Sequence, residues 1–385
     1  MNNVKNHAVV LALLVGGLFV FIGTLIFLPH AKINDTQSTF LQQLSSTSDQ
    51  PFDKVTQIKS FNFPLDHGPH NTYQTEWWYL TGNLQALNGH QFGYQLTFFR
   101  AALSPEETSR SSAWASNQIY MGHLALSDIK NDKHYVSERF SRAALGLSGA
   151  EASPFRVWLE DWEISGNKNT PFPMTLNAKT AEFGIQLKLD NLKPLILQGN
   201  QGLSQKSAEK GNASYYYTYS RIKSEGSITT ADKTHQVSGL SWMDREWSTS
   251  ALAADQAGWD WFALHLSNGY DLMYYQLRKK DGAVDSASAG VLIDPDGKHI
   301  KLTSSDVRLS AKKYWQSKDT AVRYPIDWQL DIPKEDIRLR VKAKQASQEM
   351  NVSVRYWEGA VQVNGKYKGE NVDGSGYLEL AGYQK

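Results

Sequence analysis

The sequence predicts an all-β protein whose strands are antiparallel and form barrels or a sandwich. Three observations support this: alternation of apolar and polar residues, turn sequences between the alternating runs, and no long amphipathic helix after the N-terminal segment. Phe183–Asp190 alternates throughout its length. In Ile337–Lys344 the apolar positions alternate with arginine and lysine, which is typical of a half-buried strand with a cationic outer face.

Turn sequences mark the ends of the predicted strands. Two hairpins with Asn-Gly turns are predicted: Trp77–Leu84 and Phe92–Arg100 around Asn88-Gly89, and Trp259–Leu266 and Tyr270–Arg278 around Asn268-Gly269. Asp294–Gly297 is a turn in which proline presets φ and glycine takes positive φ. Asn364-Gly365 and Asp373-Gly374 predict further turns near the C-terminal end.

Composition narrows the functional classes. The chain of 385 residues carries 40 Lys+Arg and 39 Asp+Glu, so its net charge of +1 does not support a nucleic-acid-binding surface. Cysteine is absent, which removes disulfides, thiolate metal sites and cysteine nucleophiles. Aromatic residues reach 12%, with 12 Trp, which indicates a need for flat apolar surface.

An uncharged apolar segment near the N-terminus predicts a transmembrane helix. Ala8–Leu28, as a helix, is about 31 Å long, enough to cross a bilayer core of roughly 30 Å. Lys5 precedes it and no acidic residue does, so the positive-inside rule leaves Met1 in the cytoplasm and the body in the periplasm. The alternative is a cleaved signal peptide, although Phe27–Ala31 has no clear Ala-x-Ala site.

We expect four regions along the chain: a membrane anchor or signal peptide at 1–30, a flexible tether at 31–58, a first barrel at 59–230 and a second barrel at 231–385. The boundary between the barrels is expected in the polar stretch Lys223–Gln236. A second polar stretch, Gln198–Ala213, is interpreted as a long loop.

The first aromatic cluster carries an acidic residue among its rings. In a strand, Glu76 and Trp78 face one side, and Trp77 and Tyr79 face the other. A carboxylate beside a large ring is an unusual core pattern. The run Tyr215–Tyr219 is either a strand with cross-strand aromatic pairs or a cavity wall whose hydroxyls orient a ligand.

The second aromatic cluster is Gly239–Ser248, followed closely by Gly258–Phe262. If the cluster is extended, its two faces carry Trp242, Asp244 and Glu246 on one side, and Met243, Arg245 and Trp247 on the other. Acidic residues interleaved with rings are costly to bury unless they are paired or functional. The two clusters therefore predict a ligand cavity inside the barrels.

An acid in such a cavity has a raised pKa and can protonate an alkene, and tryptophan faces stabilise the resulting cation. The candidate acids are Asp244 and Glu246, within a cage of Trp242, Trp247, Trp259 and Trp261. The alternative is structural: Asp244 pairs with Arg245 or Arg278 to fix a barrel end. His67, His70 and His123 are interpreted as polar barrel residues rather than metal ligands.

Several motifs resemble the hydroxyneurosporene synthase (carotenoid 1,2-hydratase) and AttH-like family. The resemblance covers about Phe61 to the C-terminus, and its motifs are His67–His70, Glu76–Leu84, Phe92–Arg100, Gly122–Asp128, Trp242–Ser248, Gly258–Phe262, Tyr356–Val361 and Gly376–Tyr383. It implies two tandem lipocalin-like (calycin-like) barrels that bind elongated apolar molecules. It also implies that some members hydrate isoprenoid double bonds without a cofactor.

One position departs from the hydratase pattern. Hydratase-like members have Asp-His-Asn-Trp where this chain has Asp244–Trp247, so Arg245 takes the place of the histidine. Arginine cannot shuttle protons near neutral pH. The resemblance is therefore closer to the AttH-like branch, some members of which are associated with ABC-transporter components.

We interpret the chain as an inner-membrane, single-pass protein with its body in the periplasm, or as a periplasmic protein if the N-terminal segment is cleaved. It would bind a hydrophobic or amphipathic small molecule, such as a lipid or isoprenoid, in an aromatic-lined cavity. One alternative is a cofactor-free hydratase (hydro-lyase) or isomerase that acts on an isoprenoid-type double bond. Another is an accessory subunit of a lipid-handling ABC transporter, with the permease as its partner.

These functions predict different cavities. A pocket that contains a buried, unpaired Asp244 or Glu246 favours catalysis, whereas rings and hydroxyls alone favour carriage. Besides the two candidate acids, the expected ligand-binding residues are Glu76, Trp78, Tyr79, His123, Tyr217, Trp242, Trp247, Trp259, Trp261 and Tyr274. We expect no metal, no other cofactor and no nucleic acid.

Overall fold

The computed structural model describes residues 51–106, 112, 114–231, 233–249 and 252–384. The predicted anchor Ala8–Leu28 lies outside these residues, as does most of the expected tether. Phe52 and Val55 are buried, so the described end of the tether packs on the first sheet and is not free. In the described part of the chain, no helix combines the length and apolar character that a membrane crossing requires.

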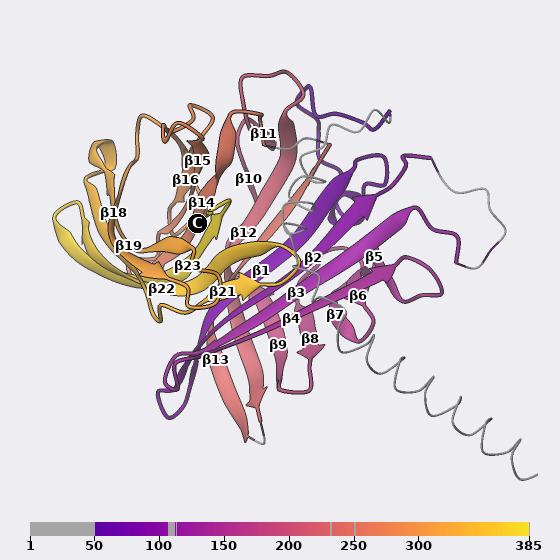
Figure 1. The fold of residues 1–385 in the computed structure, drawn as a ribbon, viewed down its shortest axis with the longest axis horizontal. Helices are drawn as coiled ribbons and strands as arrows, with labels where there is room; N and C mark the ends of the chain where they lie inside the picture. Colours follow the sequence, from indigo (N-terminus) through magenta and orange to yellow (C-terminus); the bar gives the residue numbers. More distant parts are fainter. Residues whose placement is uncertain (1–50, 107–111, 113, 232, 250–251, 385) are drawn as a thin grey trace, which may run out of the picture. The chain divides into compact units, whose positions relative to one another are not determined.

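The first sheet contains thirteen strands among the described residues (Figure 1). In chain order they are β1 (Thr75–Ala86), β2 (Gln91–Ala102), β3 (Gln118–Asp128), β4 (Lys133–Arg142), β5 (Ser148–Ala152), β6 (Phe155–Leu159), β7 (Trp162–Ser165), β8 (Met174–Lys179), β9 (Phe183–Asn191), β10 (Ile196–Leu197), β11 (Leu203–Gln205), β12 (Ala213–Thr230) and β13 (Lys233–Ser248). A short 3-10 helix, η1 (Leu65–His67), precedes them.

This sheet curls into a nearly closed barrel. Its order is β4-β3-β2-β1-β13-β12-β9-β8-β7-β6-β5, and all of its pairings along this path are antiparallel. The interior is filled by apolar side chains that include Trp78, Trp162 and Trp247, each without solvent exposure. These side chains share the interior because the apolar residues recur at every second position, and alternate residues of a strand face the same side of the sheet.

The second sheet contains ten strands among the described residues. They are β14 (Gln256–Leu266), β15 (Asp271–Lys279), β16 (Ala289–Ile293), β17 (His299–Thr303), β18 (Arg308–Gln316), β19 (Arg323–Ile332), β20 (Ile337–Ala343), β21 (Glu349–Asn351), β22 (Arg355–Tyr367) and β23 (Glu370–Ala381), with a 3-10 helix η2 (Pro333–Glu335) between β19 and β20. The order β17-β16-β15-β14-β23-β22-β20-β19-β18 forms a half-barrel with its own apolar core.

The two hairpins predicted around Asn-Gly turns are confirmed as β1–β2 and β14–β15, with Gly89 and Gly269 at positive φ. The turns predicted at Asn364-Gly365 and Asp373-Gly374 are wrong, because both pairs lie inside β22 and β23. A Cβ atom on Gly365 would lie 2.1 Å from the Arg338 carbonyl oxygen, so this glycine permits close strand approach and does not make a turn.

The chain passes from the first sheet to the second between β13 and β14, which is later than the expected boundary in Lys223–Gln236. That polar stretch instead forms the far end of the β12–β13 hairpin, where Thr230 pairs with Lys233. Its polarity reflects exposure at a hairpin end and not a linker.

Two further apolar clusters pack the sheets against each other. At one edge of this contact, Asp271 of β15 forms two ion pairs. Its Oδ1 lies 2.7 Å from the Arg221 guanidinium of β12, and its Oδ2 lies 2.8 Å from Lys193 Nζ. Gly93 of β2 lies against β22, where a Cβ atom would come within 2.5 Å of the Ala360 Cβ. The space left between the sheets is where the candidate site lies.

Candidate functional site

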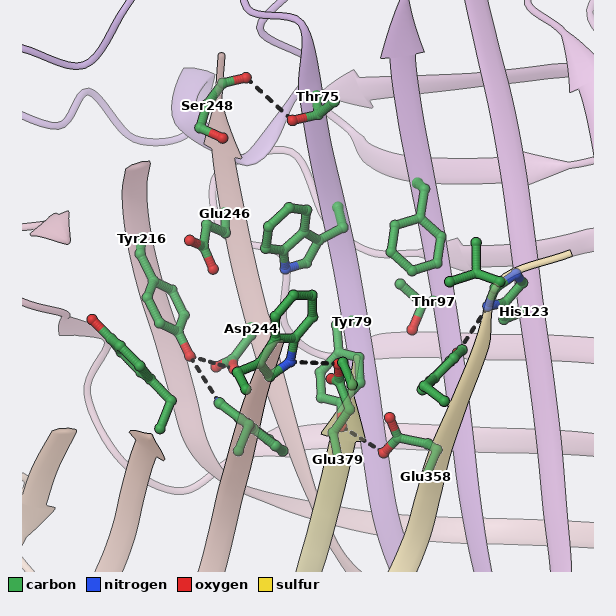
Figure 2. A pocket seen from close by; sticks show the side chains of 18 of the residues that line it. Thr75, Tyr79, Thr97, His123, Tyr216, Asp244, Glu246, Ser248, Glu358 and Glu379 are labelled. Carbon is green, nitrogen blue, oxygen red and sulfur yellow. Dashed lines mark hydrogen bonds between the residues drawn. The ribbon is translucent and has the colours of Figure 1, made fainter. Parts of the chain in front are cut away.

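A cavity of about 200 Å³ lies between the two sheets. One wall comes from β1, β2, β3, β12 and β13, and the other from β14, β15, β22 and β23 (Figure 2). The expectation that the cavity lies inside the barrels is wrong for this cavity, and the two barrel interiors hold their own apolar cores. Its lining includes the indoles of Trp77, Trp259 and Trp261 and the carboxyl groups of Asp244, Glu246, Glu358 and Glu379.

Asp244 of β13 is 4% exposed and is held by three donors. The Thr218 hydroxyl donates to Oδ1 at 2.6 Å, the Trp242 indole donates to Oδ1 at 2.8 Å, and the Tyr216 hydroxyl donates to Oδ2 at 2.5 Å. No ion pair involves Asp244 among the described residues. Burial raises the pKa of Asp244 from 3.8 to about 7, although the three hydrogen bonds favour the ionised form.

Glu358 and Glu379 lie directly opposite each other on β22 and β23. The Tyr79 hydroxyl donates to Glu358 Oε1 at 2.8 Å, and the Trp259 indole donates to Glu379 Oε1 at 2.7 Å. Loss of hydration raises the pKa of Glu379 to about 7. Burial, together with the neighbouring charge of Glu379, raises the pKa of Glu358 well above its usual range. Both walls therefore carry carboxyl groups that hold protons near neutral pH.

Glu246 has a different environment. Its Oε1 lies 2.7 Å from Lys206 Nζ and also accepts the Ser214 hydroxyl. Lys206 is the only lysine or arginine among the described residues that line the cavity. The one cationic side chain of the wall is thus already paired with an acid.

Hydrogen bonds between the sheets fix the two walls. Tyr79 reaches Glu358 across the gap, and His123 Nδ1 lies 2.8 Å from the Tyr356 hydroxyl oxygen. His123 Nε2 lies 2.9 Å from Glu138 Oε1, and burial lowers the pKa of His123. The imidazole is therefore a neutral bridging group at neutral pH.

The structure brings together part of the predicted site. The residues that line the cavity are Tyr79, His123, Asp244, Glu246, Trp259 and Trp261. Trp242 is buried and bonds to Asp244. The structure separates the rest from the cavity: Glu76, Trp78, Tyr217 and Trp247 lie within the first barrel, and Tyr274 lies in the core of the second. Strand alternation explains this, because residues one position apart face opposite sides.

The ion pair expected between Asp244 and Arg245 or Arg278 is absent. Arg245 points the other way, to Glu76, which also pairs with Arg100. Its guanidinium lies 3.9 Å from the centroid of the Trp78 ring. Arg278 pairs with Asp260 at 3.1 Å, on the core side of β14. Among the residues that the structure describes, Asp244 is therefore a buried acid without an ion-pair partner.

Sequence reasoning missed the acids of the second wall and part of the aromatic lining. Glu358 and Glu379 each interrupt a short apolar run, Tyr356–Val361 and Tyr377–Ala381, which is the signal that could have found them. Trp77 shares a strand face with Tyr79, and Tyr216 is the member of the tyrosine run that faces away from the first core. No group of three or more metal-ligating side chains is found among the described residues.

Comparison with known proteins places this geometry in context. The family model described as AttH-like matches residues 54–383. The crystal structure of a protein assigned as AttH from Nitrosomonas europaea aligns with a TM-score of 0.78 and 30% identity, covering 87% of this chain and 100% of that one. Kievitone hydratase of Fusarium solani subsp. phaseoli is 23% identical over 244 residues, 56% of this chain and 68% of that protein. The crystal structure of kievitone hydratase from Nectria haematococca shares the fold, with a TM-score of 0.66, 14% identity, and coverage of 87% of this chain and 99% of that one.

Proposed function

This chain belongs to the AttH-like family, and from that premise we propose that it binds an unsaturated apolar molecule between its sheets and converts it by acid catalysis. The proposed reaction is the addition of water to an isoprenoid-type double bond, or its isomerisation. The observation that carries the proposal is the buried carboxyl group of Asp244, which lacks an ion-pair partner among the described residues and faces an indole-lined cavity.

Asp244 has the properties of a general acid. With a pKa of about 7 it is about half protonated at neutral pH, so it can give up a proton without a cofactor. Thr218 and Trp242 both donate to Oδ1, which leaves Oδ2, beside Tyr216, as the oxygen that carries the proton. A buried acid of this kind resembles the carboxylic acids that other enzymes keep protonated by burial.

The proposed hydration has two steps. The Asp244 proton adds to one alkene carbon, and the π electron pair forms the new C–H bond and leaves a carbocation on the other carbon. Water then adds to the carbocation, and the resulting oxonium returns its proton to the Asp244 carboxylate. The indoles of Trp259 and Trp261 supply faces whose quadrupoles stabilise the cation, by about 0.5–2 kcal/mol each.

The size of the cavity limits what it holds. About 200 Å³ exceeds the roughly 150 Å³ of a cavity that binds benzene, and is below the roughly 300–1,000 Å³ of sites for drug-sized ligands. We therefore propose that the cavity takes a small ligand or the reactive end of a longer one.

The test is conversion by the purified full-length chain in detergent. Kievitone and short isoprenoid alkenes such as geraniol are incubated in isotopically labelled water, and products that have gained one labelled water are measured by mass spectrometry. Asp244→Asn is expected to lower the rate by about 100-fold or more. Asp260→Asn is the matched control, because Asp260 is a buried acid of β14 that faces away from the cavity.

Two results would contradict the proposal. The first is product formation that survives Asp244→Asn in a variant whose melting temperature matches the wild type. The second is saturable binding of these compounds, followed by tryptophan fluorescence, without any product. The second result would favour carriage of the ligand, and the aromatic lining of the cavity would then be its basis.

We also propose that the chain is held at the inner membrane with its body in the periplasm, where a lipid-handling ABC permease is a candidate partner. The support is the uncharged stretch Ala8–Leu28 preceded by Lys5. Membrane fractionation and protease accessibility in spheroplasts test this placement. Removal of residues 1–30 from an exported chain is expected to release the body, and recovery of the full chain from the cytosol would contradict the placement.

A further inference from the structure

The charge balance of the cavity wall is strongly negative. Its four carboxyl groups face one ammonium group, that of Lys206, which is already paired with Glu246. His123 adds no positive charge at neutral pH, because burial lowers its pKa. If every acid on the wall were ionised, three negative charges would be without a cation among the described residues that line the cavity.

One carboxyl oxygen on this wall has no hydrogen-bond partner in the described part of the chain. Glu358 is 0% exposed, its Oε1 accepts the Tyr79 hydroxyl, and its Oε2 finds no hydrogen-bond partner among the described residues. Glu379 is its cross-strand neighbour, so a second carboxyl group lies beside it on the same face (Figure 2). An unsatisfied buried acceptor costs about 1–3 kcal/mol, and a ligand that supplies positive charge would offset this cost.

Aromatic faces surround these acids. Trp77 lies on the first wall and Trp259 and Trp261 on the second, with Tyr79 and Tyr275 beside them. Indole faces attract cations within about 6 Å of the ring centroid, and cages of such rings recognise quaternary ammonium groups. Uncompensated carboxyl groups and indole faces favour the same kind of ligand.

We infer that the cavity is a binding site for hydrophobic organic cations, in which an ammonium group on an apolar body lies among the indoles and displaces a proton from Asp244 or Glu379. The inference rests on the proposed function, because it concerns the same cavity. The carboxyl groups and indole rings that would bind a stable ammonium ion are the same groups that would stabilise the carbocation of the proposed reaction. The inference goes further by naming a charged class of ligand.

Binding of a cation should strengthen as pH rises. Asp244 and Glu379 have pKa values of about 7, so each is mostly neutral below that pH and mostly ionised above it. A single group of this kind raises the affinity by about tenfold between about pH 6 and pH 8, in proportion to its ionised fraction. The other titratable groups on the cavity wall are Tyr79, His123, Lys206, Tyr216, Glu246, Tyr275, Tyr356 and Glu358.

The experiment compares two probes of the same shape. Benzyltrimethylammonium and neopentylbenzene differ in having nitrogen or carbon at the branch point, and therefore in charge. Calorimetric titration of the full-length chain at about pH 8 is expected to give at least about tenfold tighter binding of the cation. Titration at about pH 6, where Asp244 and Glu379 are mostly protonated, in buffers of different ionisation enthalpy is expected to show release of protons with the cation and none with the neutral probe.

Variants identify the groups involved. Asp244→Asn and Glu379→Gln are each expected to reduce the preference for the cation and the proton release, whereas Asp260→Asn, on the core side of β14, should leave both unchanged. Equal affinity for the two probes, or a preference that survives both variants, would overturn the inference. Alkene conversion without cation preference would overturn this inference alone, and cation preference without conversion would overturn only the proposed catalysis.

Discussion

Replacing Asp244 by asparagine should change how the stability of the protein depends on pH. The folded protein raises the pKa of Asp244 from 3.8 to about 7, because burial disfavours the carboxylate. Between about pH 4 and pH 7 the unfolded chain therefore binds fewer protons than the folded one, and the free energy of unfolding falls as pH rises. Above about pH 7 the penalty is constant, at about 4 kcal/mol for a shift of this size.

Asparagine at position 244 cannot ionise, so Asp244→Asn should not lose unfolding free energy through this group as pH rises. From about pH 5 to pH 8 the wild type is expected to lose about 3 kcal/mol through this one group. The unfolding free energy of Asp244→Asn relative to the wild type should therefore rise by about 3 kcal/mol over the same interval. Changes in hydrogen bonding to Thr218, Tyr216 and Trp242 add an offset that is the same at both pH values.

Urea unfolding of both proteins at the two pH values measures this difference. Glu182→Gln is the control for the loss of one carboxyl group, because Glu182 is exposed in the turn between β8 and β9. The reasoning is refuted if the difference between Asp244→Asn and the wild type is the same at both pH values. In that case Asp244 would be ionised throughout the range, and its proposed role as a general acid would lose its physical basis.

Three further substitutions test other parts of the structure. Glu76→Gln removes the carboxylate that pairs with the buried Arg100 and Arg245, so the free energy of unfolding measured in urea should fall by about 3–5 kcal/mol. Ligand affinity should be retained, because the cavity lies on the opposite face of β1. Gly93→Val adds atoms that overlap Ala360 of the other sheet, and a lower melting temperature together with weaker ligand binding is expected. Asp271→Asn weakens two ion pairs between segments of different sheets, so the protein should become more sensitive to protease between β13 and β14, whereas unchanged cleavage would show that these ion pairs are not needed to hold the sheets together.

Much of the fold could be predicted from the sequence, because strands and hairpin turns have local sequence patterns: alternation of apolar and polar residues, and Asn-Gly pairs. The alternation in Phe183–Asp190 and the Asn-Gly turns gave strands and hairpins that involve neighbours in the chain. The pairing of β1 with β13 joins residues far apart in the sequence and had no local signal. Gly365 shows the opposite failure, because a glycine needed for close strand approach looks like a turn residue in the sequence.

The candidate site was predicted in part for a related reason. Alternation correctly separated Trp77 and Tyr79 from Glu76 and Trp78, but it does not say which face meets the other sheet. The rings of both faces were therefore assigned to one cavity. Only the three-dimensional arrangement shows that odd-numbered residues of β1 and even-numbered residues of β13 share the same wall.

A binding site shared by two sheets has a mechanical consequence. Under the proposed function, a ligand held by Asp244 on one side and by Trp259 on the other would bridge the two sheets, so any change in the spacing of the sheets would alter both contacts at once. Substitutions on one sheet could change the ligand while the other sheet keeps Asp244. A site between two sheets could therefore change its ligand specificity without changes to the apolar core of either sheet.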